Sequence, residues 1–322
     1  MHDTFTLRSI ATNGITVRAA VEGSGPVLIL VHGWPELWYS WRHQIRPLAS
    51  EGYKVVAIDV RGYGGSDKPQ EIEAYDMSTL MADIVGVIDH FGEDRALLIG
   101  HDWGAPICWN TAAMHPERVA AVAGLSVPYF KRGPGPLIEL LKSVYADKFF
   151  YQLYFQEEGV AESELELDVR TSLRKIYFSV SGDSPTLNGW LQRPAEGGFL
   201  QELPNPDSFP DWMTSDDLDY FVGQFENGGF RGPLNRYRNS GRDFELLPKM
   251  GAVPIEQPSC FIAGSKDLVR YFVPGQDLYS DPGGNCTDMR VNRIIEGKGH
   301  WIQQEAPDEV TDLLVEFLRT LP

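Results

Sequence analysis

The sequence predicts an α/β protein built on a mainly parallel sheet, with helices on both faces and an all-helical insertion. Short apolar, β-branched runs alternate with amphipathic helical stretches through the first 128 residues. Residues 129–247 contain helical stretches and many aromatics, prolines and glycines, but no run typical of a buried strand; strand-like runs resume after them. Buried strands that alternate with helices are typical of parallel sheets covered on both faces.

Six strand-like runs precede the insertion and two follow it. The first two runs are amphipathic, which favours a hairpin at the start of the sheet. The expected strands are residues 4–10, 15–23, 27–33, 55–60, 96–102, 119–127, 258–267 and 289–297. The expected helices are residues 38–50, 76–91, 103–114, 136–155, 163–178 and 306–321.

The sheet is therefore made of two parts that are distant in the sequence. We expect residues 1–128 and 248–322 to form the core, and residues 129–247 to form a helical cap domain inserted in it. Ligands of such sheets bind at the carboxyl ends of the strands. The cap is expected to lie as a lid over these ends.

Composition limits the possible partners. The 322 residues include 28 Lys and Arg against 45 Asp and Glu, a net charge of -17, which disfavours binding to nucleic acid or to an anionic membrane. No signal peptide or membrane span is evident, so a cytoplasmic monomer or homodimer is expected. Three scattered cysteines favour neither a disulfide framework nor a zinc site, and neither a metal nor a cofactor is expected.

The segment GHDWGA (100–105) ends one expected strand and opens a helix. A Gly-x-nucleophile-x-Gly pattern at such a point is typical of the nucleophile elbow of hydrolases, where Gly100 and Gly104 leave room for a strained backbone. The nucleophile position holds Asp102. A carboxylate is already ionised at neutral pH and can displace a leaving group from an sp3 carbon, so Asp102 shifts the expected substrate away from acyl groups.

Such a nucleophile needs a base and a group that orients the base. Asp267 follows the strand segment CFIAG (260–264) and His300 follows the last strand, so both lie at the sheet edge that carries Asp102. Taken singly, each is more often a turn residue, a helix cap or a structural histidine. The elbow, the HGWP turn (32–35), the late acid and the histidine nevertheless fall in one workable order, which favours a catalytic triad.

Five segments carry a family resemblance. HGWPE, DVRGYGGSDKP, GHDWGA, AGSKDLV and GKGHWIQQEAP are similar to the soluble epoxide hydrolases of the α/β-hydrolase fold, and the similarity covers nearly the whole chain. The resemblance implies an α/β-hydrolase fold with a cap, and a hydrolase of ether bonds that converts an apolar epoxide and water to a vicinal diol. The elbow also resembles that of haloalkane dehalogenases, which use the same triad.

The two families differ in how the leaving group is stabilised. An epoxide opens to an alkoxide, which requires an acid such as tyrosine. FFYQLYFQEEGVAE and GPLNRYR resemble the two tyrosine segments of the epoxide hydrolases, which implies that Tyr151 and Tyr237 hold and protonate the epoxide oxygen. Tyr154 is the alternative to Tyr151, because residues three apart on a helix lie near the same face. The match to the family segment favours Tyr151.

The resemblance further implies a reaction in two stages. Asp102 attacks an epoxide carbon and forms an ester, and His300, oriented by Asp267, then activates a water that attacks the ester carbonyl. Backbone N–H groups of Trp34 and Trp103 are expected to hold the oxyanion that forms in this second stage.

Other residues have weaker support. Glu36 and His101 match family positions that place the hydrolytic water or pass its proton, although a loop carboxylate and a packed histidine explain them nearly as well. Aromatic side chains are expected to form an apolar pocket, which favours aryl or alkyl epoxides over charged ones. The residues assigned to this pocket are Trp38, Phe150, Tyr154 and Trp190.

Two alternatives to an epoxide hydrolase stay open. The nearer is a haloalkane dehalogenase that acts through the same Asp102 ester. The second is a non-catalytic ligand-binding protein of the same fold, against which the presence of Asp102, Asp267 and His300 together argues.

Overall fold

The computed structural model describes residues 5–185, 191–208 and 210–322. Within them lies an eight-stranded sheet of order β1-β2-β4-β3-β5-β6-β7-β8. Its strands are β1 (Leu7–Thr12), β2 (Ile15–Gly23), β3 (Val27–Val31), β4 (Lys54–Ile58), β5 (Ala96–His101), β6 (Val119–Leu125), β7 (Ser259–Gly264) and β8 (Met289–Ile295). Strands β3 to β8 are parallel, and the hairpin β1–β2 joins β4 in antiparallel orientation. The predicted mainly parallel sheet with an opening hairpin is confirmed.

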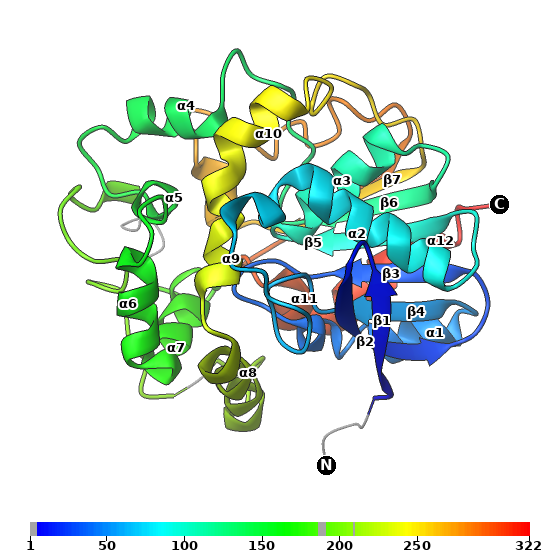
Figure 1. Cartoon of the computed structure of the whole chain (residues 1–322), viewed down its shortest axis with the longest axis horizontal. Helices are drawn as coiled ribbons and strands as arrows, with labels where there is room; N and C mark the ends of the chain where they lie inside the picture. Colours follow the sequence, from blue (N-terminus) through cyan, green and yellow to red (C-terminus); the bar gives the residue numbers. More distant parts are fainter. Residues whose placement is uncertain (1–4, 186–190, 209) are drawn as a thin grey trace.

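Helices cover both faces of the sheet (Figure 1). Helices α2 (Met77–His90) and α3 (Gly104–Met114) pack together, as do α1 (Ile45–Ser50) and α12 (Pro307–Leu318). The crossovers from β3 to β4 and from β4 to β5 run in opposite directions, so their right-handed connections put α1 and α2 on opposite faces. Every residue of β3, β5 and β7 is buried, as expected for strands covered on both sides. Shorter core elements are η1 (Trp38–Trp41), η2 (Ile72–Tyr75), η5 (Leu268–Tyr271) and α11 (Ile302–Glu305).

Helical elements occupy the chain between β6 and β7, and in Figure 1 they gather on one side of the sheet. They are α4 (Leu137–Val144), α5 (Tyr151–Tyr154), α6 (Val160–Leu167), α7 (Val169–Ser179), α8 (Ser215–Gly228), α9 (Arg231–Asn235), η4 (Tyr237–Asn239) and α10 (Ser240–Leu246). In the described part of this insertion, β-type pairing is limited to one bridge between Lys148 and Pro194. The cap boundaries at 128/129 and 247/248 stay a prediction.

Two stretches of the insertion that the sequence predicts as single helices are each divided in two. The first breaks between α4 and α5, where the Phe149 N–H donates to the Arg193 carbonyl at 2.9 Å. The second breaks between α6 and α7 at Asp168, whose carboxylate accepts the Thr171 N–H at 3.0 Å and caps α7. A side chain that caps a new helix competes with continuation of the preceding one.

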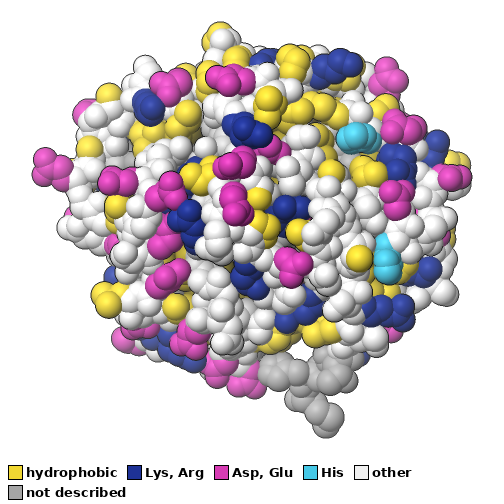
Figure 2. Space-filling model, viewed as in Figure 1, with side chains coloured by type: hydrophobic (Ala, Val, Ile, Leu, Met, Phe, Trp, Pro, Cys, Tyr) yellow, Lys and Arg dark blue, Asp and Glu magenta, His cyan; other side chains and the backbone are white. Residues whose placement is uncertain are grey.

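The surface carries charges of both signs. Figure 2 shows Asp and Glu side chains spread among Lys and Arg, without a gathering of basic side chains on the visible face. Among the helices of the described residues, none is both long enough and apolar enough to cross a membrane.

Candidate active site

Asp102 lies at a strained turn between β5 and α3. Its φ is 48°, in the left-handed region that residues other than glycine adopt at an energetic cost. The flanking glycines make the turn possible. A Cβ on Gly100 would lie 2.1 Å from the Gly104 carbonyl oxygen, and a Cβ on Gly104 would lie 2.0 Å from that of Val31. The turn has the close backbone approach that the elbow pattern predicts.

Asp267 and His300 lie beside Asp102, on the loops that follow β7 and β8. His300 Nε2 is 3.3 Å from Asp102 Oδ2, and His300 Nδ1 is 3.0 Å from Asp267 Oδ2. Asp267 is fully buried, whereas the exposed fractions of Asp102 and His300 are 9% and 7%. The three residues that the sequence singled out therefore come together in the arrangement expected of a nucleophile, a base and an orienting acid.

The charges of this group favour a protonated histidine in the resting site. Burial lowers the pKa of His300, but the carboxylates of Asp267 and Asp102 raise it by more, so it lies well above 6.5. Burial raises the pKa of Asp267, and the neighbouring imidazole lowers it by more. Esterification of Asp102 would remove one of the two negative charges and lower the pKa of His300, which frees the imidazole to act as a base.

The turn after β3 supplies an amide to the nucleophile. The Trp34 N–H donates to Asp102 Oδ1 at 2.7 Å. A Cβ on Gly33 would lie 2.3 Å from the same oxygen, so only glycine leaves room for the carboxylate there. Among the described residues, the Trp103 amide makes no hydrogen bond to this carboxylate. The oxyanion role of Trp103 stays a prediction.

Tyr151 and Tyr237 extend from the helical insertion toward this turn. Their ring centroids are 5.8 Å apart with planes at 79°. The centroid of the Tyr237 ring is 5.3 Å from that of Trp103 and 6.0 Å from that of Trp34. Trp103 follows Asp102 in the chain, and the Trp34 N–H donates to the Asp102 carboxylate. Burial raises the pKa of both tyrosines, so both hydroxyls keep their protons at neutral pH.

Tyr154, the alternative to Tyr151, is engaged elsewhere. Its hydroxyl donates to Glu164 Oε2 at 2.8 Å. Phe150 is buried with its ring centroid 5.1 Å from that of Tyr151. The structure therefore brings Tyr151 and Phe150 to the site and turns the Tyr154 hydroxyl toward α6.

Comparison with known proteins identifies the family. The α/β-hydrolase fold model matches residues 26–307. The chain is 44% identical over 320 residues to epoxide hydrolase A of Mycobacterium tuberculosis, with 98% of both chains covered. It is 38% identical over 316 residues to epoxide hydrolase 2 of Siraitia grosvenorii, with 97% of both covered. The crystal structure of epoxide hydrolase A from Mycobacterium thermoresistibile superposes with a TM-score of 0.92 at 42% identity, covering 99% of both chains. This chain belongs to the epoxide hydrolase family.

The family and the α/β-hydrolase fold that the sequence motifs predict are thus confirmed. In this epoxide hydrolase family member, Glu36 and His101 form a fully buried pair next to the triad. His101 Nδ1 is 2.6 Å from Glu36 Oε2, and His101 Nε2 is 2.8 Å from the carbonyl oxygen of His300. Burial raises the pKa of Glu36, but the charge of His101 lowers it by more, to about 2. The pair supports the main chain of His300, and its role toward water stays a prediction.

The predicted pocket residue Trp38 is not among the rings that the described residues place around Asp102. The ring contacts of Trp38 within the described residues are with Phe5, Tyr39 and Tyr220, and its indole N–H donates to the Tyr220 hydroxyl at 2.8 Å. Its assignment to the pocket thus finds no support in its contacts. Trp190 lies outside the described residues.

Two phenylalanines that the sequence analysis missed complete the aromatic wall. The Phe155 ring is 5.1 Å from that of Tyr237, and the Phe199 ring is 5.1 Å from that of Phe155. Phe155 follows Tyr151 by four residues, so helical spacing could have found it. Phe199 lies on a loop, where no periodic pattern marks it.

Glu305, which the sequence analysis also missed, holds the loop that carries His300. Its Oε2 accepts the N–H groups of Gly182 and Gly299 at 2.9 and 2.8 Å, and its Oε1 accepts that of Trp301 at 3.0 Å. Gly299 and Trp301 flank His300, whereas Gly182 belongs to the predicted cap. One buried carboxylate therefore ties the His300 loop to the insertion.

Proposed function

We propose that this protein converts an epoxide and water to a vicinal diol through a covalent ester on Asp102. The observation that carries the proposal is the pair of buried tyrosines, 5.8 Å apart, across from a triad whose nucleophile is a carboxylate. Phenolic acids suit an epoxide, because its oxygen leaves as an alkoxide that must be protonated. The names of the relatives agree with this chemistry. The surrounding rings favour an apolar small-molecule epoxide.

In the first stage, Asp102 Oδ2 attacks an epoxide carbon and the ring carbon–oxygen bond breaks. The Trp34 N–H holds Oδ1, which leaves Oδ2 as the attacking atom. Tyr151 and Tyr237 hydrogen-bond the oxygen, and one of them donates its proton to it. The products are a β-hydroxyalkyl ester and a tyrosinate, which recovers its proton from the His300 imidazolium.

In the second stage, neutral His300 removes a proton from a water that attacks the Asp102 ester carbonyl. The Trp34 amide, and in our proposal the Trp103 amide, stabilise the oxyanion. Collapse of the tetrahedral intermediate releases the diol and restores the Asp102 carboxylate and the His300 imidazolium. The protons balance, since the one that water loses ends on His300.

The second candidate function is dehalogenation through the same ester. The Trp34 indole N–H is buried and has no hydrogen-bond partner within the described residues. Indole N–H groups are suitable donors to a departing halide. The phenolic protons of the tyrosine pair have no role in that reaction, which is why the epoxide takes precedence.

A substrate comparison tests the proposal. The enzyme is incubated with styrene oxide and with 1-bromobutane, and diol and bromide are measured. We expect diol formation that is abolished in Asp102→Asn and strongly reduced in the Tyr151→Phe, Tyr237→Phe double variant. Bromide release without diol formation would establish the dehalogenase instead. Turnover of neither compound, with both bound, would favour the non-catalytic ligand-binding protein.

We also propose that the protein is cytoplasmic, because its three scattered cysteines suit a reducing compartment. Fractionation of cells that express the tagged chain tests this location, and recovery in the membrane pellet would contradict it.

A further inference from the structure

The Tyr151 hydroxyl has a hydrogen-bond donor beside it in the chain. The side-chain amide of Gln152 donates to Tyr151 Oη at 3.1 Å. Gln152 is half-buried and follows Tyr151 in α5. A phenol oxygen can accept hydrogen bonds and donates a single proton. An N–H that donates to Oη therefore leaves the Tyr151 proton for a ligand.

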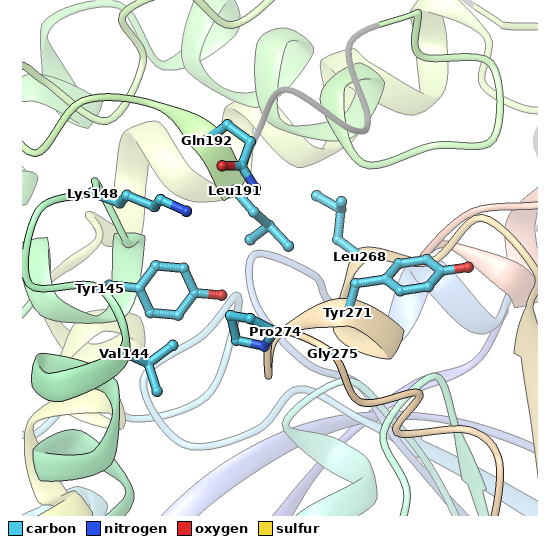
Figure 3. Close-up of a pocket in the computed structure, with 9 residues that line it drawn as sticks. All are labelled: Val144, Tyr145, Lys148, Leu191, Gln192, Leu268, Tyr271, Pro274 and Gly275. Carbon is cyan, nitrogen blue, oxygen red and sulfur yellow. The ribbon is translucent and has the colours of Figure 1, made fainter.

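Aromatic rings pack around Tyr151. Its ring centroid lies 5.1, 5.5 and 6.1 Å from those of Phe150, Phe155 and Phe272. Tyr145 stacks on Phe150 at 4.2 Å and lines a separate cavity of about 310 Å³ (Figure 3), so two rings lie between that cavity and Tyr151. In such apolar surroundings, a hydrogen bond to an oxygen that becomes charged is stronger than it would be in water.

A second glutamine holds the main chain of Gln152 in place. Gln156 Nε2 donates to the Gln152 carbonyl at 2.7 Å and to the Tyr237 carbonyl at 3.1 Å. The main chain of α5 is thus tied to the start of η4, which joins the two tyrosine segments. A donor on a backbone held in this way suits the preorganised stabilisation of a developing charge.

The two tyrosines differ in their surroundings. Burial raises the pKa of Tyr151, whereas hydrogen bonds with Gln152 and Tyr237 lower it. Burial also raises the pKa of Tyr237, and the Trp103 side chain lowers it by less. The Tyr151 oxygen has two partners that stabilise its anion, so it is the better placed of the two to lose a proton.

We propose that Gln152 makes Tyr151 the tyrosine that protonates the epoxide oxygen, while Tyr237 holds that oxygen by a hydrogen bond. As the ring carbon–oxygen bond breaks, the Tyr151 proton moves to the epoxide oxygen. The Gln152 N–H stabilises the Tyr151 oxyanion that remains, and this oxyanion recovers its proton from the His300 imidazolium. Gln152 acts through Tyr151 and is a positioning residue. The inference rests on the proposed function and assigns different roles to its two tyrosines.

A double-mutant cycle on ester formation tests the role of Gln152. Ester formation is measured in single turnovers with styrene oxide by intact mass spectrometry. Gln152→Met keeps the length of the side chain and removes the donor, and we expect it to slow ester formation about 10-fold, as for one hydrogen bond to a charged oxygen. The same loss should appear in the Tyr237→Phe background and fall below about twofold in the Tyr151→Phe background. Equal losses in both backgrounds would mean a structural role and would overturn the proposal.

The matched control is Gln276→Met, the same change at an exposed position between β7 and β8. It should leave the rate of ester formation unchanged. A loss there equal to that of Gln152→Met would overturn the specific role of Gln152.

A titration without turnover separates this inference from the proposed function. A fluorinated tyrosine at position 151 has a more acidic phenol, whose ionisation is followed by the absorbance of the phenolate. We expect Gln152→Met to raise the pKa of this phenol by about 1, and to leave that of a fluorinated tyrosine at position 237 nearly unchanged.

Each outcome of the titration is informative. An unchanged pKa at position 151 would overturn the proposal. A lowered pKa would also overturn it, because the Gln152 amide would then accept the Tyr151 proton rather than donate its own. A raised pKa at position 151, in an enzyme that forms no ester from styrene oxide, would support the role of Gln152 toward the Tyr151 anion and refute the proposed function.

Discussion

Replacing Glu305 with glutamine should slow ester hydrolysis far more than ester formation. The Glu305 carboxylate accepts three N–H groups, from Gly182, Gly299 and Trp301, at 2.8 to 3.0 Å. A glutamine has one carbonyl oxygen. In the better orientation, the glutamine carbonyl oxygen takes the Oε2 position and accepts the N–H groups of Gly182 and Gly299. Its NH2 group then faces the Trp301 N–H. One buried donor is then left without an acceptor beside His300.

A buried donor without a partner costs about 1–3 kcal/mol. We therefore expect Glu305→Gln to lower the free energy of unfolding by about that amount, and the melting temperature by roughly 2 °C or more. The glutamine NH2 group and the Trp301 N–H are both donors, so they move apart. This movement displaces the Trp301 amide and with it His300. A displacement on the order of 1 Å costs about 10²-fold in a step that depends on the displaced group. Ester formation uses Asp102 and the tyrosines, and should change less than about threefold by the same reasoning.

Single-turnover reactions with styrene oxide, quenched rapidly and followed by intact mass spectrometry, measure the two stages separately. The expected result is alkylated Glu305→Gln enzyme that persists while diol appears about 10²-fold more slowly than in wild type. Glu309→Gln, the same change at an exposed position of α12, is the matched control. Glu305→Asp keeps the charge and should recover part of the rate. Equal slowing of both stages, or of neither, would refute a positioning role for Glu305.

Three further predictions concern the nucleophile, the tyrosines and pH. Tyr237→Phe should slow ester formation by about 10²- to 10⁴-fold if its hydroxyl is a general acid, and a loss below tenfold in single turnovers would show that Tyr151 suffices. Gly33→Ala should slow ester formation on the order of 10²-fold, because its Cβ would lie 2.3 Å from Asp102 Oδ1; unchanged kinetics in a folded variant would contradict this. Ester hydrolysis should rise with pH through a His300 pKa below the raised value of the resting site, because the ester has lost the Asp102 charge. Equal pKa values, from the single-turnover profile and from NMR titration of resting His300, would count against this explanation.

The parts of the site that sequence could predict are those fixed by a local turn. Gly100 and Gly104 flank Asp102 within five residues, and the geometry of that turn admits few other residue types. Asp267 and His300 lie on the loops that begin at the ends of β7 and β8, so the parallel sheet itself brings them to the edge that carries Asp102. Their spacing along the chain is large, but the fold determines their position.

The parts that sequence could not predict depend on contacts between distant segments. Glu305 and Gly182 are 123 residues apart, and a carboxylate that accepts backbone N–H groups leaves no pattern in the partner sequence. Phe199 reaches the tyrosine pair from a loop without periodicity. The indole N–H of Trp38 donates to the hydroxyl of Tyr220 in α8, a contact between distant segments that no sequence pattern marks. Resemblance chose Tyr151 over Tyr154, and the Glu164 contact of Tyr154 gives that choice a physical reason.

The covalent ester on Asp102 is the central claim, and the position of the oxygen from water tests it most directly. A single turnover with excess enzyme in heavy-oxygen water is followed by proteolysis and mass spectrometry of the peptide that contains Asp102. Because water attacks the ester carbonyl, the account predicts heavy oxygen in the Asp102 carboxylate after one turnover and unlabelled diol. Label in the diol alone, with an unlabelled Asp102 peptide, would mean that water opens the epoxide directly and would contradict the account.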